Sequence, residues 1–411
     1  MSSNARVSVI LTSFNHEKYL KEAIDSVLNQ TFADFELIIW DDASSDGSWE
    51  IINTYNDPRI KAFRNDTQKR AVWGINKAIL EVAKGEYIAI HHSDDVWEPE
   101  KLEKQAAYLD SHPEMGAVFT WARIIGEEGR AFADPDHFYF RIFEQPSRPR
   151  FEWLNHFFYR GNALCHPSVL IRKRCYDDVG VYRYGFGQIG DFDMWVRLAM
   201  KHEIHVMPEK LVRFRVREGE ANTSGNRPES HIRGRLEYFQ ILYCYLGIRD
   251  PDEFQRIFPN SMKYFGGTEY DIGFALAMMA LDAPREFSHL FGLQLLFEIL
   301  NDPARAKRVG RIYNFSTRDF LRLNTELDVF SARLRDYTFP QLQAQLTERD
   351  AQLAERDAQL AEIYASRSWR LVLILRKLRL WLLPPGSRRE VAGRFLSRTL
   401  RAFKQRLFRK P

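Results

Sequence analysis

The sequence is poor in cysteine and has no long apolar run. Its three cysteines, Cys165, Cys175 and Cys244, form neither a CxxC pair nor a disulfide framework, which is typical of a reducing compartment. No stretch reaches the roughly 18 uninterrupted apolar residues of a membrane span, and no apolar core of a secretion signal follows Met1. A G-x-x-x-x-G-K-[ST] loop is also missing, which argues against ATP-driven chemistry. We therefore expect a cytoplasmic protein.

What is present is a globular composition with an uneven charge. The 411 residues are 45% hydrophobic and 28% charged, enough for two domains with appendages. The net charge is +4, but residues 364–411 hold fourteen of the 59 Lys and Arg and only one of the 55 Asp and Glu. That segment therefore carries +13 and the remainder −9. The excess positive charge belongs to the C-terminal tail.

Strand-like and helix-like patterns alternate through the first 110 residues. Apolar runs predict strands at residues 7–11, 37–40, 60–63 and 87–91, with helices between and after them. This alternation predicts an α/β fold with a mainly parallel sheet covered by helices on both faces. Further along, we expect short strands at 117–121 and 211–216 and a helix at 191–201.

The second half of the chain predicts helices. Residues 226–338 have large apolar residues at helical spacing, which indicates a separate helical domain. Residues 339–365 contain a seven-residue repeat, with one Leu per heptad and Ala elsewhere on the seam. This repeat predicts either a short coiled coil, and with it a homo-oligomer, or a solvated spacer helix.

The last segment, residues 366–411, interleaves apolar and Trp residues with Arg and Lys. We expect the apolar residues on one side of a helix and the cations on the other, as in helices that lie on anionic lipid. A second basic amphipathic stretch is expected at residues 388–409. Nucleic-acid binding is the alternative, but the many Leu, Ile and Trp residues favour lipid.

Two acidic segments each follow a predicted buried strand. Asp41 and Asp42 follow the second strand, and Asp94 and Asp95 follow the fourth. Carboxylates at the C-terminal ends of strands in an open α/β sheet face the crevice where ligands bind. Adjacent carboxylates there suit a divalent cation that holds a diphosphate. The pattern predicts an enzyme that uses a nucleotide-sugar.

Several segments, which match in order and spacing, resemble the family-2 glycosyltransferases of the GT-A fold: residues 7–15 (VSVILTSFN), 23–31 (AIDSVLNQT), 35–47, 85–88 and 94–95. The resemblance implies a GT-A domain at residues 1–225, with a Rossmann-like sheet. It also implies an enzyme that moves a sugar from a nucleoside diphosphate to a hydroxyl. The Gln-x-x-Arg-Trp element of processive polysaccharide synthases is absent, which favours the addition of one or a few sugars.

The resemblance implies roles for the residues that match the family's motifs. Thr12 and Asp42 would hold the nucleoside, and Asp42 would accept the imide N–H of uracil or thymine, because an ionised carboxylate only accepts. Asp41 would support the loop. Asp94 and Asp95 would hold Mn²⁺ or Mg²⁺ and the diphosphate, with Asp95 as the direct ligand and Asp94 also near the sugar or ribose. The alternative is that both acidic pairs only form turns and helix caps.

An inverting transfer also needs a general base for the acceptor hydroxyl. Asp191 aligns best with the family's base at the head of a helix, and Asp193 is the fallback. Gly190 stands where the family usually has its first acid, so the match is incomplete. The alternative is that both acids only offset the helix dipole.

Four further residues stand near these motifs. We expect His91 and His92 to pack or to support the site indirectly rather than to bind metal. Arg70 stands where relatives often have Gly, and it would approach the diphosphate. His166 would either contact acceptor or phosphate, or be a buried structural histidine.

Together these observations favour a metal-dependent, inverting glycosyltransferase at the inner face of the cell membrane. Its donor would be a UDP-sugar or a dTDP-sugar, and its acceptor a cell-surface glycan or a lipid-linked intermediate, as in polysaccharide or lipopolysaccharide synthesis. The alternative is an inactive, transferase-like scaffold in a membrane-bound envelope-assembly complex. Gly190 and the long C-terminal half motivate that alternative.

Overall fold

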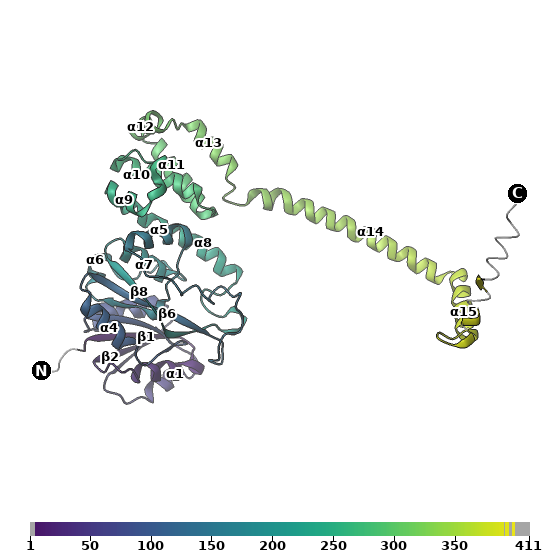
Figure 1. The fold of residues 1–411 in the computed structure, drawn as a ribbon, viewed down its shortest axis with the longest axis horizontal. Coiled ribbons are helices and arrows are strands. Elements are labelled where there is room, and N and C mark those ends of the chain that lie inside the picture. The colour runs from purple at the N-terminus through teal and green to yellow at the C-terminus, as the bar shows by residue number, and fades with distance from the viewer. Residues whose placement is uncertain (1–4, 390, 394–396, 399–411) are drawn as a thin grey trace. The chain divides into compact units, whose positions relative to one another are not determined.

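The structure, a computed structural model, describes residues 5–389, 391–393 and 397–398. The first part of the chain forms an eight-stranded sheet (Figure 1). Its strands are β1 (Val7–Ser13), β2 (Phe35–Asp41), β3 (Ile60–Arg64), β4 (Tyr87–His92), β5 (Val96–Trp97), β6 (Met115–Ile125), β7 (Leu170–Arg172) and β8 (Glu203–Arg215).

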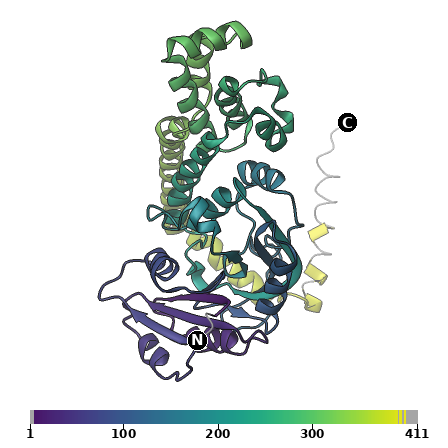
Figure 2. The same cartoon turned by 90° about the vertical axis from the view of Figure 1, so that its left-hand side faces the viewer.

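The strands lie in the order β3-β2-β1-β4-β7-β6-β8-β5. β1 pairs in parallel with β2 and β4, β2 with β3, and β6 with β8. β7 runs antiparallel between β4 and β6, and β5 runs antiparallel on the edge of β8. The prediction of a mainly parallel sheet is confirmed, and the turned view in Figure 2 shows its twist.

Seven helices flank these strands in the described chain before residue 200. They are α1 (Glu17–Leu28), α2 (Ser48–Asn53), α3 (Ala71–Lys77), α4 (Lys101–Ser111), α5 (Arg150–Arg160), α6 (Cys175–Val179) and α7 (Gly190–Ala199).

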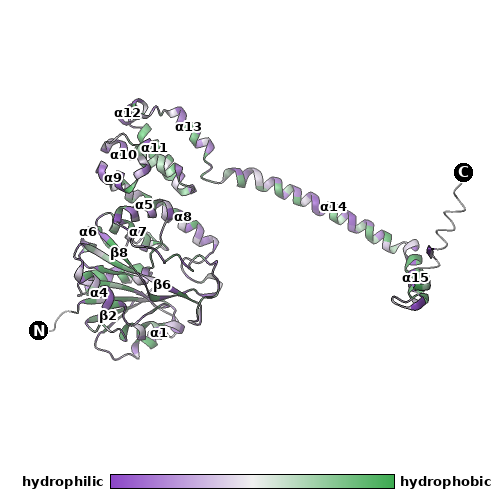
Figure 3. Ribbon diagram, in the orientation of Figure 1, coloured by the Kyte–Doolittle hydropathy of each residue, from purple (hydrophilic) through white to green (hydrophobic). Residues whose placement is uncertain are grey.

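Alternate side chains of each strand feed two cores, because successive residues of a strand point to opposite faces. Ile10 and Ile38 pack on one face with residues of α3, α5 and α7. Val9 and Leu37 pack on the other with residues of α1 and α4. Since both faces of β1, β2 and β4 are covered, these three strands are almost continuous apolar runs. Hydrophobic residues are green in Figure 3.

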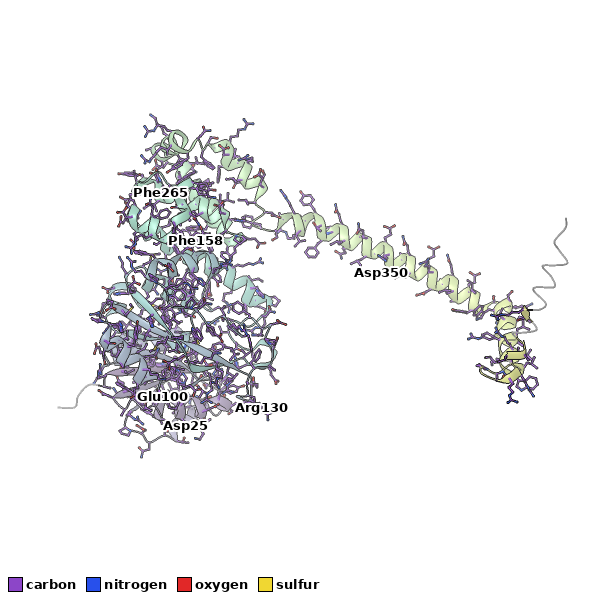
Figure 4. The ribbon with its side chains drawn as sticks, in the orientation of Figure 1. Asp25, Glu100, Arg130, Phe158, Phe265 and Asp350 are labelled. Atoms are coloured by element: carbon purple, nitrogen blue, oxygen red, sulfur yellow. The ribbon has the colours of Figure 1, made fainter. Side chains whose placement is uncertain are left out.

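Six more helices follow the sheet and share one of its cores. They are α8 (Pro228–Leu242), α9 (Pro251–Ile257), α10 (Glu269–Asp282), α11 (Glu286–Leu300), α12 (Pro303–Tyr313) and α13 (Thr317–Glu326). Phe158 of α5, labelled in Figure 4, lies 5.0 Å from Phe258 between ring centroids, and both belong to this core. A compact unit therefore continues through Val329. The boundary expected after residue 225, between the GT-A domain and the helical domain, stays a prediction.

The predicted strands of the first 110 residues agree with the observed ones to within two residues. Among the strands and α-helices named so far up to β8, five had no prediction: β5, α5, β7, α6 and the first half of β8. β7 has only three residues, too few for a periodic pattern. In β8, buried residues such as Ile204 and Val206 alternate with partly exposed polar ones, so no apolar run marks the strand.

A second compact unit begins at Phe330 and contains α14 (Phe339–Ala365) and α15 (Arg367–Leu382). Both helices occupy segments predicted to be helical. Every residue of α14 is exposed, and Figure 4 shows its side chains, Asp350 among them, standing out from the helix. Among the described residues, no helix combines the length and the apolar character needed to cross a bilayer. The stretch expected at 388–409 falls largely outside the described residues.

Candidate functional site

The carboxyl ends of β1, β2 and β4 meet at one large cavity. Thr12 lies in register with Trp40 of β2 and His92 of β4, so the residues that follow these strands share one edge of the sheet. The cavity has a volume of about 1220 Å³. Its lining includes every residue predicted to form the site: Thr12, Asp42, Arg70, Asp94, Asp95 and Asp191.

Asp42, directly after β2, is held by protein donors. Its Oδ1 accepts hydrogen bonds from Asn65 Nδ2 and the Lys69 backbone N–H, each 2.7 Å long. Its Oδ2 accepts one from the Arg70 backbone N–H at 2.7 Å. Each carboxylate oxygen has room for two donors, so Oδ2 keeps one acceptor position for a ligand.

Asp41 supports the loop, as predicted. It is fully buried and accepts hydrogen bonds from the backbone N–H and the hydroxyl of Ser44. Arg64 Nε lies 3.4 Å from its Oδ1. The same segment also forms a turn, because Asp46 accepts the backbone N–H groups of both Ser48 and Glu17.

Arg70 has a backbone conformation that suits glycine. Its φ of 70° and ψ of 155° lie in a region that non-glycine residues enter only at a cost of about 1–3 kcal/mol. Its N–H bonds to Asp42, while its exposed side chain lines the cavity. Ala43, with a φ of 61°, is a second strained residue at this edge. Arginine in place of glycine therefore strains the backbone but adds a positive charge at the cavity.

His92, Asp94 and Asp95 form a cluster that fits a divalent cation. One ligand atom from each lies within 4.8 Å of the others. Asp95 Oδ1 accepts the Arg215 backbone N–H at 2.8 Å, but the buried Oδ2 has no hydrogen-bond partner in the described part of the chain. A buried carboxylate oxygen without a donor is costly unless a cation or proton reaches it, and burial raises the pKa of Asp95 to about 6. The two carboxylates suit Mn²⁺ or Mg²⁺, and the imidazole is a candidate third donor.

The two adjacent histidines differ. His91 is fully buried, as expected of a packing residue. His92, the last residue of β4, instead lines the cavity, with Nδ1 3.3 Å from Asp95 Oδ2. Its Nε2 lies 3.1 Å from His166 Nδ1, and His166 Nε2 lies 3.0 Å from the Tyr182 hydroxyl. His92 is therefore a candidate ligand. His166 is packed and also lines the cavity, so both alternatives for it stay open.

Asp191, the second residue of α7, lies at the same cavity. Its Oδ2 accepts a hydrogen bond from Asn162 Nδ2 at 3.0 Å. Burial raises the pKa of Asp191 to about 6. A carboxylate with a pKa near the working pH suits a general base.

Asp193 is wrong as a fallback base. It is fully buried and pairs with Arg197 at 2.8 Å and Arg183 at 3.1 Å. Side chains two positions apart on an α-helix point in directions that differ by roughly 200°. Asp193 therefore faces away from the side of α7 that carries Asp191. At Gly190, a Cβ would lie 3.2 Å from Phe186 Cβ, so an acid there requires Phe186 to shift.

The rest of the cavity wall could not be predicted from the sequence. Arg217 Nη1 lies 2.8 Å from His16 Nε2, and both line the cavity beside Asp94. Tyr238 of α8 and Phe287 of α11 stack at 5.1 Å and also line it. In the sequence, these two aromatic residues cannot be distinguished from the other large apolar residues of the helical region. Only the tertiary fold brings them to the cavity.

The N-terminal half of the chain is similar to known proteins. Residues 8–172 match the family described as "Glycosyl transferase family 2". An uncharacterized glycosyltransferase of Methanocaldococcus jannaschii is 30% identical over 215 residues, which make up 51% of this chain and 70% of that protein. The chain belongs to glycosyltransferase family 2. The transferase is thus a nucleotide-sugar-dependent enzyme, as its sequence predicted.

Two further relatives bear on its fold and chemistry. WfaP of Escherichia coli, a UDP-Glc:alpha-D-GlcNAc-diphosphoundecaprenol beta-1,3-glucosyltransferase, is 27% identical over 197 residues, 47% of the transferase and 70% of WfaP. The crystal structure of S. aureus TarS 1–349 with UDP-GlcNAc is similar with a TM-score of 0.50 and 20% identity. It covers 80% of the transferase and 92% of the TarS chain. This likeness confirms the predicted GT-A fold.

We expect Arg70→Gly to stabilise the fold and to weaken donor binding. Relief of about 1–3 kcal/mol of strain, less the roughly 1 kcal/mol entropic cost of glycine, should raise the free energy of unfolding by about 1 kcal/mol. Loss of the cation should lower the affinity for UDP. Urea unfolding and titration calorimetry measure the two effects, and Arg70→Lys, which keeps charge and strain, should change neither much. Unchanged UDP affinity in the glycine variant would show that this side chain does not approach the diphosphate.

Proposed function

We propose that the transferase is a metal-dependent, inverting enzyme that moves a sugar from a UDP-sugar to a hydroxyl of a lipid-linked or cell-surface glycan. One observation carries this proposal. Asp42, Asp95 and Asp191, remote in the sequence, line a single cavity with the chemistry needed for the nucleoside, the diphosphate and the acceptor.

Donor binding is assigned to Thr12, Asp42 and Arg70. The open acceptor position on Asp42 Oδ2 suits the imide N–H that uracil and thymine share. The relatives favour uridine: the name of WfaP specifies UDP-Glc, and TarS was crystallised with UDP-GlcNAc. Arg70 adds positive charge for the diphosphate.

His92, Asp94 and Asp95 would hold the Mn²⁺ or Mg²⁺ ion. Such an ion acts as a Lewis acid that neutralises the charge of the departing diphosphate. Arg217 adds a second cation here, because its Nε lies 3.8 Å from Asp94 Oδ2. Asp95 is fixed by the Arg215 backbone N–H and so presents Oδ2 toward His92 in a set direction.

Asp191 would take the proton from the acceptor hydroxyl as that oxygen attacks the anomeric carbon. Attack on the side opposite the departing diphosphate inverts the configuration at that carbon. The hydrogen bond from Asn162 to Oδ2 would orient the carboxylate toward the acceptor hydroxyl. For the acceptor, we favour a lipid diphosphate sugar of the kind that the WfaP name specifies.

We expect Asp191→Asn to lower turnover by roughly 10²–10⁴-fold, the usual contribution of a general base. In the parent enzyme, turnover should rise with pH through about 6, because the base works only after it loses its proton. That rise should vanish in the variant. EDTA should abolish turnover in the parent, and added Mn²⁺ should restore it. Release of UDP from UDP-sugars measures each effect.

Asp177→Asn, the same change on the exposed surface of α6, is the matched control and should keep full activity. Full turnover of Asp191→Asn, and full turnover in EDTA, would remove this mechanism. If calorimetry showed UDP and Mn²⁺ binding but no donor or acceptor gave turnover, the inactive-scaffold alternative would be favoured.

We also propose that the tail holds the transferase at the inner face of the membrane. Along α15, apolar side chains such as Leu371, Ile374 and Trp381 are exposed. The expectation that the cations lie on one side of this helix is wrong. Arg379 lies nine positions after Arg370, which places the two side chains on opposite sides of the helix. The helix would therefore bind at the interface with its long basic side chains reaching the headgroups.

In vesicle flotation, we expect the full chain to bind anionic vesicles much better than neutral ones, and less well as salt rises. Arg376→Glu with Lys377→Glu should weaken this binding, because each cation near an anionic surface contributes about 1 kcal/mol. Lys307→Glu with Arg311→Glu, the same change of charge on α12, is the matched control. Equal flotation of both double variants would contradict a role for α15.

The third proposal is that α14 pairs with α14 of a second copy, in parallel. Leu346, Leu353 and Leu360 recur every seven residues and are all exposed. Residues three or four positions from each Leu flank this Leu stripe. They are Arg349 and Arg356 on one side and Asp350 and Asp357 on the other, not Ala as expected.

The charges favour one orientation of the pair. In a parallel two-stranded coil, opposite flanks of the two helices meet, so each Arg faces an Asp of the other copy. In an antiparallel pair, like flanks meet, so Arg faces Arg and Asp faces Asp. A parallel pair also brings the two α15 helices, which start after Ser366, to the same end, where two weak membrane contacts reinforce each other.

We expect disulfide cross-linking to report this orientation. Leu346→Cys and Leu360→Cys should each form dimers on oxidation, but a mixture of the two variants should give no 346-to-360 product. The parent chain, whose Cys165 and Cys175 are buried, measures the background. A 346-to-360 product would indicate an antiparallel pair, and no cross-link above background would favour the solvated spacer helix.

A further inference from the structure

Glu237 of α8 is a buried carboxylate that the mechanism above does not use. It is only 5% exposed. Its Oε1 accepts the Gly187 backbone N–H at 2.7 Å, and its Oε2 accepts those of Gln188 at 3.1 Å and Ile189 at 2.8 Å. Three successive backbone N–H groups thus converge on one negative charge, an arrangement that fixes a loop strongly because charge-assisted hydrogen bonds are the stronger kind.

The loop that Glu237 holds leads straight into Asp191. Ile189 is the last residue before α7, and Asp191 is the second residue of that helix. No side chain within this segment caps the start of α7. The direction in which Asp191 enters the cavity therefore depends on a loop whose charged anchor comes from a different helix.

The neighbouring residue of α8 supports the other side of the base. Tyr238 packs against Phe192 at 5.3 Å between ring centroids. Its hydroxyl lies 2.7 Å from the place of a Cβ on Gly161, whose φ is 88°, so only glycine fits there. Gly161 precedes Asn162, which donates the hydrogen bond to Asp191. Consecutive residues of α8 thus support both the loop before the base and the residue that orients it.

We propose that Glu237 is a positioning residue that sets the geometry of Asp191. The proposal rests on the proposed function, because it acts through the base named there. It also gives the helical region after residue 226 a part in the reaction: α8 lies beyond the matched residues 8–172 and yet supplies the contact that orients the base. A misplacement of about 1 Å at a reacting group can cost 10²-fold in rate.

A double-mutant cycle tests this proposal. Glu237→Gln keeps the size of the side chain but removes the charge that three N–H groups share. We expect it to lower kcat by roughly 10–100-fold, while the affinity for UDP with Mn²⁺ stays unchanged because Asp42 and Asp95 lie on other elements. In an Asp191→Asn background, Glu237→Gln should lower kcat no further, because residues that act as a unit are not additive.

Glu229→Gln, the same change at an exposed position in the first turn of α8, is the matched control and should leave kcat unchanged. Thermal unfolding of each variant establishes that it is folded, and Glu237→Asp replaces Glu237→Gln in the cycle if the latter does not fold. Multiplicative losses in the double variant would overturn the proposal, since a general effect on the fold adds to the loss of the base. An unchanged kcat in Glu237→Gln would overturn it too. An unimpaired Asp191→Asn would instead overturn the proposed function itself.

Discussion

The site depends on carboxylates that are kept out of water by a limited number of protein donors. An ionised carboxylate is costly to bury without hydrogen bonds, so the loops around each one are fixed by the need to supply them. Asp42 receives three such bonds, which fix the position of its carboxylate at the cavity. Asp95 and Asp191 are hydrogen-bonded too, but for both of them burial outweighs the donors and raises the pKa to about 6. These two acids are the ones that we assign to a cation and a proton.

The topology of the sheet explains why these acids meet. The parallel strands β1, β2 and β4 end at one edge, which places Thr12, Asp42 and Asp95 together. The antiparallel step through β7 then carries the chain to α7, whose N-terminus points Asp191 at the same edge. The helices after residue 226 close the wall and share a core with the sheet. The catalytic half and the helical half of this compact unit therefore form one site.

Sequence reasoning succeeded where burial is uniform and failed where it is not. β1, β2 and β4 are covered on both faces, so each forms a continuous apolar run from which the strand could be predicted. β7 is too short for a pattern, and β8 is half exposed. The same limit applies within motifs: His91 and His92 are adjacent, but only His92 lines the cavity.

By itself, the sequence determined the α/β class, the family and the acidic residues of the cavity, because these follow from local apolar runs and from short motifs at fixed spacing. Only the tertiary structure decided which acid of a pair is available. Asp193 is excluded because Arg197 and Arg183 pair with it, and Asp191 remains because its helix turns it to the cavity. Glu237 had no motif at all. Its role arises from three backbone N–H groups about fifty residues earlier, and contacts of that kind exist only after the chain has folded.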